Sequence, residues 1–520
     1  MFRQFAGAAL ALAMCVPSWG QSPAQVDAAF SRMTHATPGC VFGIERRGQP
    51  QMIRAYGSAD LGHGVANTPE TVFEAGSVSK QFTAAAILLL AADGRLSLND
   101  DVRKYVPELP DYGGPITLEH LLTHTSGVRD WLELEAMAGH PLGSQVLTNQ
   151  QVLRNIARQS ALNFPPGSRF SYSNSGYELL AEVAERVSGK SLPRFTRERI
   201  FQPLGMTSTR WRDDFRAIVP RLATGYAPTA EGFRQDMPFS NDYGSGALLT
   251  TVGDLLIWNR ALNDRRLGAF LTEELQRPGK LLGYARGVTH TTDRGHRGIS
   301  HTGSRAGYRA MLARYPDAGV SFAMLCNTSA PPSRDAVIDF VFGRSPQSPP
   351  SASPEAAARA GLYVDDAYGL PLRLALDAGG LKHGADALIP ISEGRWRPAL
   401  RDIDYAFAPD GRLTITDPED IRTYRRADPY APSPTDLRAF VGRFRTPDLD
   451  VEYVVAAEEN RLTLRRGDQP PAALEAAYRD AFTTPAGSIV RFVREPTGRV
   501  VGLRFGTPRG VWDLRFTRID

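Results

Sequence analysis

The sequence lacks the features that assign many proteins to a class at once. No run of basic residues is interleaved with aromatic residues, and the net charge of +4 is small for 520 residues, so we expect no nucleic-acid partner. No apolar run is long enough to cross a bilayer, so we expect no integral membrane segment. The composition, 42% hydrophobic and 22% charged, is that of a soluble globular protein. The length predicts two to four domains.

Cysteine is scarce, with three residues in the chain. Cys15 lies within the first twenty residues, which leaves Cys40 and Cys326 for the rest of the chain. An oxidising compartment permits a bridge between these two, but isolated cysteines are equally well buried free thiols. The count leaves both alternatives open.

The N-terminus is expected to be a secretory signal. Arg3 precedes an apolar stretch at 5–16, and small residues follow at Ser18 and Gly20. This order is typical of a signal peptide, here residues 1–20, that is cut after Gly20. We therefore expect a secreted or periplasmic protein.

Lysine is rare as well, accounting for five of the 60 Lys and Arg residues. One of the five, Lys80, follows Ser77 by three residues within 74–90, an alanine-rich apolar stretch that predicts a buried helix. The two side chains then share one face of the helix, with a primary amine beside a hydroxyl. A serine becomes a strong nucleophile when a neighbour takes its proton, which a desolvated lysine can do. Alone, the spacing is a weak signal, because a helix start followed by a surface lysine gives the same pattern.

The expected elements of the first part of the chain describe an α+β domain. Strands are expected near both of its ends and helices in its middle, which suggests one antiparallel sheet assembled from the two ends. The expected strands are 38–45, 51–56, 299–302, 308–315 and 320–327, and the expected helices are 74–90, 117–127, 149–160, 174–188, 251–263 and 333–342.

Two segments rich in Pro and Ser, 345–354 and 428–434, divide the remainder. The two pieces that they separate alternate apolar and polar residues with frequent turns, and they resemble each other weakly at an offset of about 81 residues. This pattern predicts two small antiparallel β-barrels. The expected domains after the signal are therefore 21–345, 355–427 and 435–520.

Two further motifs follow the serine and lysine. Tyr172 and Asn174 lie just before a predicted helix, and the sequence His-Thr-Gly at 301–303 lies on a predicted strand. In this order the three motifs resemble those of the penicillin-binding, class C β-lactamase-like serine hydrolases. The connecting sequences at 94–100, 120–127 and 246–255 are similar to that family too. The resemblance covers roughly residues 25–345, and it implies the β-lactamase/transpeptidase-like fold for the catalytic domain.

The resemblance also implies a role for each motif residue. Ser77 is expected to attack an acyl carbonyl and form an acyl-enzyme, while Lys80 and Tyr172 share the proton transfers. Which of these two is the general base stays open, because coupled groups need not have a single answer. Asn174 is expected to hydrogen-bond the lysine or the substrate amide. The backbone N–H groups of Ser77 and Ser304 are expected to form the oxyanion hole.

The sequence departs from the family pattern at His301, where its β-lactamases and transpeptidases usually carry lysine. Histidine is mostly neutral at pH 7, which argues against β-lactam or cell-wall carboxypeptidase activity. Histidine here resembles the esterase and D-aminopeptidase branches. We expect His301, Gly303 and Ser304 to contact the substrate. Arg305 either restores a carboxylate-binding charge or is a solvated strand residue.

A catalytic domain followed by two small β-barrels is similar to the bacterial D-aminopeptidases. In that group a loop from the last barrel reaches the active site and favours substrates with a free amino end. By this resemblance one of four aspartates is expected to pair with a substrate ammonium; they are Asp365, Asp366, Asp448 and Asp450. The alternative is that the barrels are spacers or cell-wall anchors.

The sequence thus predicts an exported serine hydrolase that cleaves small peptides or amides and needs no cofactor or metal. One alternative is a carboxylesterase, β-lactamase or DD-carboxypeptidase of the same family. Another is a catalytically silent protein that binds peptidoglycan or a partner. A zinc hydrolase is disfavoured, because Glu119 precedes His120 instead of following it in the pair His120 and His124. Neither the substrate nor the oligomeric state follows from the sequence.

Overall fold

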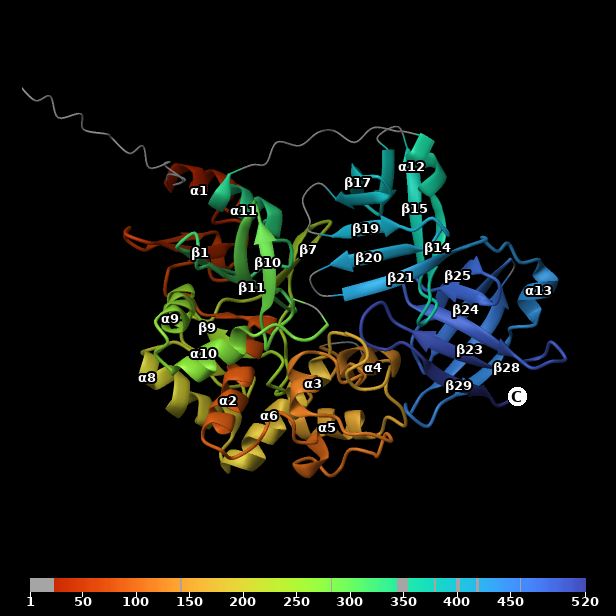
Figure 1. Cartoon of the computed structure of the whole chain (residues 1–520), viewed down its shortest axis with the longest axis horizontal. Coiled ribbons are helices and arrows are strands. Elements are labelled where there is room, and N and C mark those ends of the chain that lie inside the picture. The colour runs from red at the N-terminus through yellow and green to blue at the C-terminus, as the bar shows by residue number, and fades with distance from the viewer. Residues whose placement is uncertain are drawn as a thin grey trace, which may run out of the picture.

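The computed structural model describes most of the chain, namely residues 23–140, 143–281, 283–343, 354–377, 380–398, 403–417, 420–458 and 460–520. The expected signal peptide, residues 1–20, lies outside the described residues, as does nearly all of the Pro/Ser segment 345–354. The described chain forms an α+β domain followed by two closed antiparallel β-barrels, as the sequence predicts (Figure 1).

A six-stranded antiparallel sheet lies at the centre of the first domain. In sheet order its strands are β10 (Thr289–Asp293), β11 (His296–Arg305), β12 (Tyr308–Tyr315), β13 (Val320–Cys326), β1 (Cys40–Arg46) and β2 (Met52–Tyr56). The register of β1 and β13 places Cys40 opposite Cys326, and a disulfide joins the two. The bridge is therefore the alternative that the structure contains, and it connects the two ends of the domain.

The domain contains helices that cover both faces of this sheet and further helices that pack on them. They are α1 (Pro23–Ala29), α2 (Lys80–Ala92), α3 (Leu118–Leu122), α4 (Trp131–Met137), α5 (Asn149–Ala157), α6 (Asn174–Ser188), α7 (Leu192–Thr196), α8 (Gln202–Leu204), α9 (Val252–Asn263), α10 (Ala269–Gln276) and α11 (Arg334–Phe342), with shorter turns η1 (Gly76–Ser79), η2 (Val102–Lys104) and η3 (Arg197–Phe201). Phe42 and Phe322 pack in the cluster that α1 and α11 form on one face, while Val41 and Leu325 pack in the cluster that contains α2 and α9 on the other. This alternation follows from the two-residue period of a strand.

Short strands lie outside the main sheet. They are β3 (Ser58–Asp60), β4 (Val65–Ala66), β5 (Phe73–Glu74), β6 (Arg210–Trp211), β7 (Tyr226–Thr229), β8 (Gly232–Gln235) and β9 (Leu248–Thr250). One set of them, β5, β9 and β6, positions the start of α2. β5 pairs with β9 and leads directly into η1, so backbone hydrogen bonds fix the chain just before Ser77.

Two differences from the expected elements bear on the active site. The polar strand β10 was not predicted, because its sequence of Thr, His and Asp lacks an apolar face. The helix expected at 117–127 begins as predicted, with Thr117 and His120 forming a capping box, but it ends at Leu122. The chain then turns at His124, whose φ of 56° lies in the left-handed region.

Each barrel is a closed sheet of eight antiparallel strands. The first contains β14 (Gly361–Asp365), β15 (Pro371–Asp377), β16 (Gly380–His383), β17 (Asp386–Ser392), β18 (Arg395–Pro398), β19 (Asp404–Phe407), β20 (Leu413–Asp417) and β21 (Asp420–Ala427), preceded by helix α12 (Pro354–Arg359). The second contains β22 (Gly442–Arg445), β23 (Glu452–Glu458), β24 (Arg461–Arg466), β25 (Ala472–Tyr478), β26 (Ala481–Thr483), β27 (Ile489–Arg494), β28 (Val500–Gly506) and β29 (Leu514–Arg518), preceded by helix α13 (Pro434–Arg438). The first three strands of the two barrels begin 81 residues apart, which is the offset of the sequence repeat.

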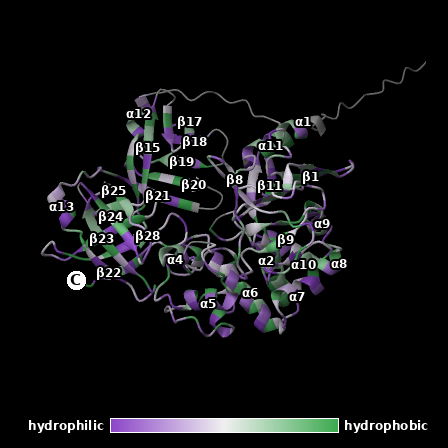
Figure 2. Cartoon of the chain, turned by 180° about the vertical axis from the view of Figure 1, so that it is seen from behind, coloured by the Kyte–Doolittle hydropathy of each residue, from purple (hydrophilic) through white to green (hydrophobic). Residues whose placement is uncertain are grey.

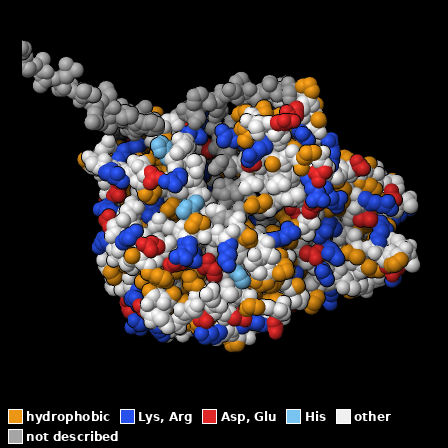
Figure 3. Space-filling model, viewed as in Figure 1, with side chains coloured by type: hydrophobic (Ala, Val, Ile, Leu, Met, Phe, Trp, Pro, Cys, Tyr) orange, Lys and Arg blue, Asp and Glu red, His pale blue; other side chains and the backbone are white. Residues whose placement is uncertain are grey.

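The second barrel is docked on the catalytic domain through α4. Leu134 and Met137 pack into the hydrophobic core of the barrel, and the hydroxyl of Tyr453 donates to the carbonyl of Met137 at 2.9 Å. Figure 2 shows hydrophilic and hydrophobic residues along the barrel strands, as expected where one face of each strand is buried. On the face seen in Figure 3, acidic and basic side chains are interspersed, in keeping with the small net charge.

Candidate active site

The serine and lysine of the first motif lie side by side where η1 runs into α2. Lys80 is fully buried, whereas Ser77 is half-buried. The Nζ atom of Lys80 lies 3.2 Å from the Oγ atom of Ser77. The alanine-rich sequence of α2 allows the helix to be buried on nearly all sides, which takes the amine out of water. A buried amine beside a reachable hydroxyl is the arrangement of an activated nucleophile.

The amine of Lys80 is held by two further acceptors. It donates to Oδ1 of Asn174 and to the backbone carbonyl of Ser245, each at 2.8 Å. A carbonyl oxygen can only accept, so both bonds use N–H groups of the lysine. Of the three contacts, the one with the Ser77 hydroxyl is the one whose direction can reverse. The geometry therefore lets a neutral Lys80 receive the proton of Ser77.

Tyr172 lies on the other side of the amine. The Nζ atom of Lys80 is 4.8 Å from the centre of the Tyr172 ring. Ser173, the next residue, caps α6 by accepting the N–H of Gly176, and Asn174 is the first residue of that helix. One helix start thus carries the tyrosine and the asparagine to the same lysine.

A cluster of rings fixes the orientation of Tyr172. The ring centres of His124 and Tyr172 are 4.2 Å apart, and that of Tyr284 lies 4.5 Å from His124. The Nδ1 atom of His124 accepts the backbone N–H of Ser173 at 3.1 Å. Burial, together with the charge of Lys80, lowers the pKa of His124 well below its ordinary value. His124 is therefore a neutral wall of the site.

β11 brings His301 into the same cluster. Its Nδ1 atom lies 2.6 Å from the carbonyl oxygen of Thr302, which can only accept, so Nδ1 carries the proton. The Nε2 atom then accepts from the hydroxyl of Tyr284 at 3.1 Å. Burial, opposed by the bond to Thr302 and reinforced by the charge of Lys80, lowers the pKa of His301 to about 4. His301 is thus neutral at pH 7 and supplies no permanent charge.

The backbone of β11 packs tightly against the turn that carries the serine. Gly76 has a φ of 51°, and a Cβ there would lie 2.5 Å from the nitrogen of Ser304. A Cβ on Gly303 would lie 1.9 Å from the carbonyl oxygen of Ala75 and 3.1 Å from the nitrogen of Ser77. Glycine is required at both positions, because a side chain would separate the strand from the turn. The two nitrogens expected to form the oxyanion hole are thereby brought to the same place.

The outer edge of β11 is open beside this place. β10 pairs with residues 296–300 of β11 and stops there. Thr302 and Ser304 are exposed, whereas His301 and Gly303, which alternate with them along the strand, are buried. A substrate can therefore lie along residues 301–305 and reach the serine.

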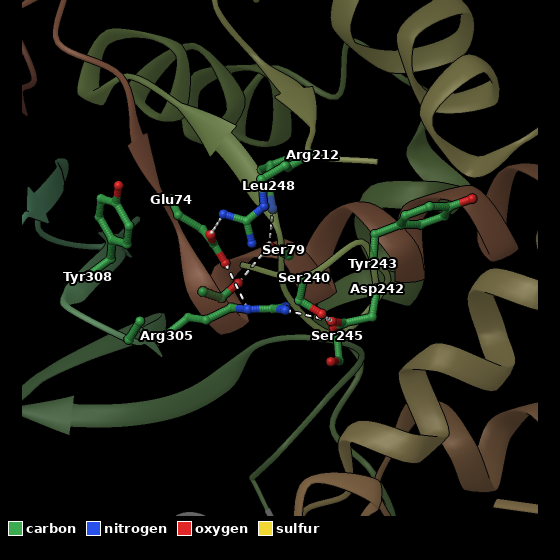
Figure 4. A network of polar contacts seen from close by, with 12 residues as sticks. Glu74, Ser79, Arg212, Ser240, Asp242, Tyr243, Ser245, Leu248, Arg305 and Tyr308 are labelled. Atoms are coloured by element: carbon green, nitrogen blue, oxygen red, sulfur yellow. Dashed lines mark hydrogen bonds and ion pairs between the residues drawn. The ribbon is translucent and has the colours of Figure 1, made fainter. Parts of the chain in front are cut away.

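Arg305 belongs to a buried ion network behind the site, which Figure 4 shows from close by. Its guanidinium lies 3.3 Å from Glu74 and 2.7 Å from Asp242, and Glu74 also pairs with Arg212 at 2.5 Å. All four side chains are at most 10% exposed. Both sequence interpretations of Arg305 are therefore wrong: it is neither solvated nor turned toward a substrate. Both acidic partners lie more than sixty residues from Arg305 in the sequence, so no local pattern predicts these contacts.

Glu178 connects this network to Lys80 through Ser245. One of its carboxyl oxygens accepts the backbone N–H of Ser245 at 3.1 Å and the hydroxyl of the same residue at 2.7 Å. Burial, followed by the charge of Asp242, raises the pKa of Glu178 to about 8, whereas Arg305 holds the pKa of Asp242 below its ordinary value. At pH 7 Glu178 is therefore protonated and Asp242 ionised.

A loop of the last barrel, residues 507–513 between β28 and β29, contacts segments that flank the site. Its carbonyl at Arg509 accepts a hydrogen bond from the hydroxyl of Ser171, the residue before Tyr172, at 3.1 Å. Its carbonyl at Gly510 accepts the backbone N–H of Asp130 at 3.0 Å. The resemblance to D-aminopeptidases implied such a loop, and the structure shows that it contacts the segment that carries Tyr172.

Sequence reasoning missed several residues that position the site. Asp130 accepts the backbone N–H of Asn174 through Oδ2 and caps α4 through Oδ1, which accepts the N–H of Leu132 at 3.0 Å. An aspartate directly before the apolar start of a helix is a capping signal, so Asp130 could have been noticed. His124, Tyr284 and Glu178 act through contacts that no spacing rule predicts.

Three of the four barrel aspartates are bound to other groups of the protein. Asp448 is buried and bound to Arg129 at 2.6 Å, so it joins the barrel to the catalytic domain. Asp365 accepts two backbone N–H groups of its own loop. Asp366 lies 3.6 Å from an arginine of the same barrel. Asp450 is exposed. The expectation that one of the four meets a substrate ammonium stays a prediction, and the ion pair with Arg129 argues against Asp448.

The two histidines considered for a zinc site, His120 and His124, form hydrogen bonds with the backbone. His120 accepts the backbone N–H of Thr117 at 3.3 Å, and Glu119 pairs with Arg286 at 2.8 Å. Within the part of the chain that the structure describes, no group of three or more His, Cys, Asp or Glu side chains is arranged to hold a metal. None of the helices in that part is both long and apolar enough to cross a membrane.

The fold and the site together define a class of protein. Residues 26–342, more than half of the chain, match the family described as Beta-lactamase. The protein belongs to this family, and it is a serine hydrolase that carries two β-barrels after the catalytic domain.

Three comparisons place the chain within that class. It is 28% identical to a D-aminopeptidase of Cereibacter sphaeroides (strain KD131) over 500 residues, which cover 90% of this chain and 94% of the relative. Its fold is similar to that of an octameric penicillin-binding protein homologue from Pyrococcus abyssi, with a TM-score of 0.56, 22% identity and coverage of 85% and 96%. It is also similar to that of a D-amino acid amidase from Ochrobactrum anthropi SV3, with a TM-score of 0.52, 21% identity and coverage of 59% and 91%.

Proposed function

We propose that this protein is a D-aminopeptidase-like amidohydrolase, which removes a D-amino acid from the free amino end of a small peptide or amide. The observation that carries the proposal is the similarity to a D-aminopeptidase over 90% of the chain, which includes both barrels. The adjacent Ser77 and Lys80 supply the nucleophile and a proton acceptor for this reaction.

The acylation step follows from the contacts of the site. The hydroxyl of Ser77 attacks the acyl carbon as its proton passes to Lys80, with Tyr172 close enough to share the transfer. The negative charge on the carbonyl oxygen is stabilised by the N–H groups of Ser77 and Ser304. The proton is then delivered to the leaving nitrogen, the amine departs, and the acyl group remains as an ester on Ser77.

Deacylation uses the same groups in reverse. A water molecule takes the place of the departed amine and loses its proton to the Lys80–Tyr172 pair. Attack on the ester regenerates the Ser77 hydroxyl and releases the acid. Asn174 and the carbonyl of Ser245 keep the amine of Lys80 in place through both steps.

The neutral state of His301 supports an amide or ester substrate over a β-lactam. A β-lactam or a cell-wall donor peptide carries a carboxylate close to the scissile bond, and a permanent cation on this strand suits it. Here the strand offers an uncharged ring that is bonded to Tyr284. The name of the Pyrococcus homologue favours penicillin binding as the second candidate, and a carboxylesterase is the third.

We also propose that the protein works outside the cytoplasm. The sequence of residues 1–20 supports this, and the disulfide between Cys40 and Cys326 fits an oxidising compartment. Fractionation of cells that produce the full chain tests it, since an exported protein is expected in the periplasm or medium with residue 21 at its new N-terminus.

The activity is tested with D-alanine p-nitroanilide, its L-isomer, a p-nitrophenyl ester and a chromogenic cephalosporin, with Ser77→Ala as the blank. Preference for the D-anilide supports the proposal. Hydrolysis of the ester alone identifies an esterase, and turnover of the cephalosporin alone favours a β-lactamase. No turnover of any substrate by the folded protein contradicts an enzymatic role and favours a binding protein.

A further inference from the structure

A small cavity lies where the catalytic domain and the two barrels meet. Its volume is about 190 Å³. Arg169 and Phe170 of the catalytic domain, Tyr368 and Arg422 of the first barrel and Trp512 of the second line it. A volume of this size is below the roughly 300–1,000 Å³ of sites that bury a whole drug-sized ligand, so it fits one residue of a larger molecule.

The cavity has an apolar floor and an apolar rim. The rings of Tyr368 and Trp512 are stacked with their centres 4.8 Å apart, and Phe170 is buried beside them. Leu281 and Ile421 stand at the rim with exposed fractions of 39% and 50%. Exposed aliphatic side chains around an aromatic floor favour an apolar guest.

Among the described residues that line the cavity, two are basic and one is acidic. Arg422 donates to the carbonyl of Pro508 and lies 5.6 Å from the ring centre of Tyr368, so its position is fixed. Arg169 is exposed, and no other described residue forms an ion pair or hydrogen bond with its guanidinium. The acidic lining residue, Asp365, already accepts two backbone N–H groups through one oxygen. The exposed guanidinium of Arg169 is therefore available to an anion at the mouth of the cavity.

One residue that lines the cavity also contacts the ring cluster of the site. Phe170 precedes Tyr172 by two positions, and its ring centre lies 5.9 Å from that of Tyr284. Tyr284 in turn binds His301. The same short segment thus lines the cavity on one side and presents the tyrosine to Lys80 on the other.

We propose that this cavity is a leaving-group subsite that binds an apolar residue with a free carboxylate, such as the C-terminal residue of a short peptide. The apolar side chain lies on the rings of Tyr368 and Trp512, and the carboxylate pairs with Arg169, assisted by Arg422. The inference rests on the proposed function, because only a peptidase has such a leaving group. It gives the barrels a role in choosing the substrate through its carboxyl end.

The kinetic test compares D-alanyl-L-leucine with its C-terminal amide. The protein is expected to show a KM about tenfold lower for the free acid. Arg169→Ala is expected to remove this preference, and Arg169→Lys to restore part of it. Arg373→Ala, which changes an exposed arginine on the first barrel, is the matched control and should keep the wild-type ratio. Equal KM values for acid and amide in the wild-type protein would overturn the proposal.

A second measurement does not require turnover. Binding of N-acetyl-L-leucine and of N-acetyl-L-leucinamide to the full-length Ser77→Ala protein is measured by calorimetry. Tighter binding of the acid, lost in the additional Arg169→Ala variant, supports the subsite even if no D-anilide is hydrolysed, in which case the proposed function alone fails. Hydrolysis of the D-anilide with no discrimination between acid and amide in binding refutes the subsite and leaves the proposed function standing.

Discussion

Glu178 binds Ser245 through two hydrogen bonds, and the carbonyl of the same serine accepts a hydrogen bond from Lys80. Asn174, one turn before Glu178 on α6, holds the amine from another side. A single helix therefore positions Lys80 twice, once directly through Asn174 and once through Ser245. Glu178 is buried and carries its proton at pH 7. As the pH rises, its ionisation is expected to weaken the contacts that position Lys80.

The first prediction concerns Glu178→Gln. The pKa of Glu178 in the folded protein, about 8, lies above its ordinary value of 4.5, so the folded state holds a proton that the unfolded state has lost between these values. The free energy of unfolding must then fall as the pH rises through this interval and be lowest above pH 8. The glutamine variant should lose less stability between pH 6 and 9, with a difference on the order of 1–3 kcal/mol.

Urea unfolding at pH 6 and pH 9 measures this difference. Glu231→Gln, which alters an exposed glutamate in the turn between β7 and β8, is the control and should behave like the wild-type protein. Parallel pH dependence in the Glu178→Gln and wild-type proteins would show that the proton of Glu178 is not linked to folding.

A second prediction concerns the nucleophile and its partner. Ser77→Ala should reduce kcat at least about 10³-fold, since it removes the attacking oxygen. Lys80→Met should reduce kcat to a similar degree, because Asn174 and Ser245 lose their donor and Ser77 its proton acceptor. Thermal unfolding separates a chemical effect from misfolding. A folded Lys80→Met protein with full activity would mean that Tyr172 alone is the base.

A third prediction concerns acid sensitivity. The pKa of His301, about 4, lies below its ordinary value of 6.5. Between pH 6.5 and 4 the unfolded state therefore binds a proton that the folded state does not bind. The free energy of unfolding must therefore fall as the pH is lowered from 6.5 toward 4. His301→Gln should remove up to about 3 kcal/mol of that fall.

Unfolding at pH 7 and at pH 4.5 checks the effect of His301. His35→Gln changes an exposed histidine and is the matched control. If both variants lose the same stability as the wild-type protein on acidification, the histidine is not the group that resists protonation.

A fourth prediction concerns the link between the barrel and the catalytic domain. Asp448→Ala leaves the buried guanidinium of Arg129 without its carboxylate, and such a loss typically costs about 3–5 kcal/mol. Limited proteolysis should then release the second barrel sooner than in the wild-type protein. Asp450→Ala, two residues away and exposed, should have no such effect. Equal proteolysis of the two variants would contradict a docking role for Asp448.

The parts of the fold that sequence patterns predicted are those governed by local periodicity. α6 spans Asn174–Ser188, as its apolar spacing indicates, and the repeat of about 81 residues matches the strands of the two barrels. Ordered motifs also identified the residues that the structure brings together around Lys80. Such signals depend on residues that are close in the sequence, so a single sequence is enough to find them.

The parts that sequence patterns did not predict depend on long-range packing. Arg305 stands directly after a motif residue, yet its partners Glu74 and Asp242 come from other elements. The loop 507–513 meets Ser171 from more than 330 positions away. The polar sequence of β10 does not predict a strand, because its pairing with β11 is what makes it one.

The placement of α4 has a consequence for how this enzyme can be altered. Leu134 and Met137 pack into the hydrophobic core of the second barrel. Removal of that barrel would therefore expose these apolar side chains of the catalytic domain to water. The C-terminal portion is therefore no detachable module, and a shortened chain would be prone to aggregate.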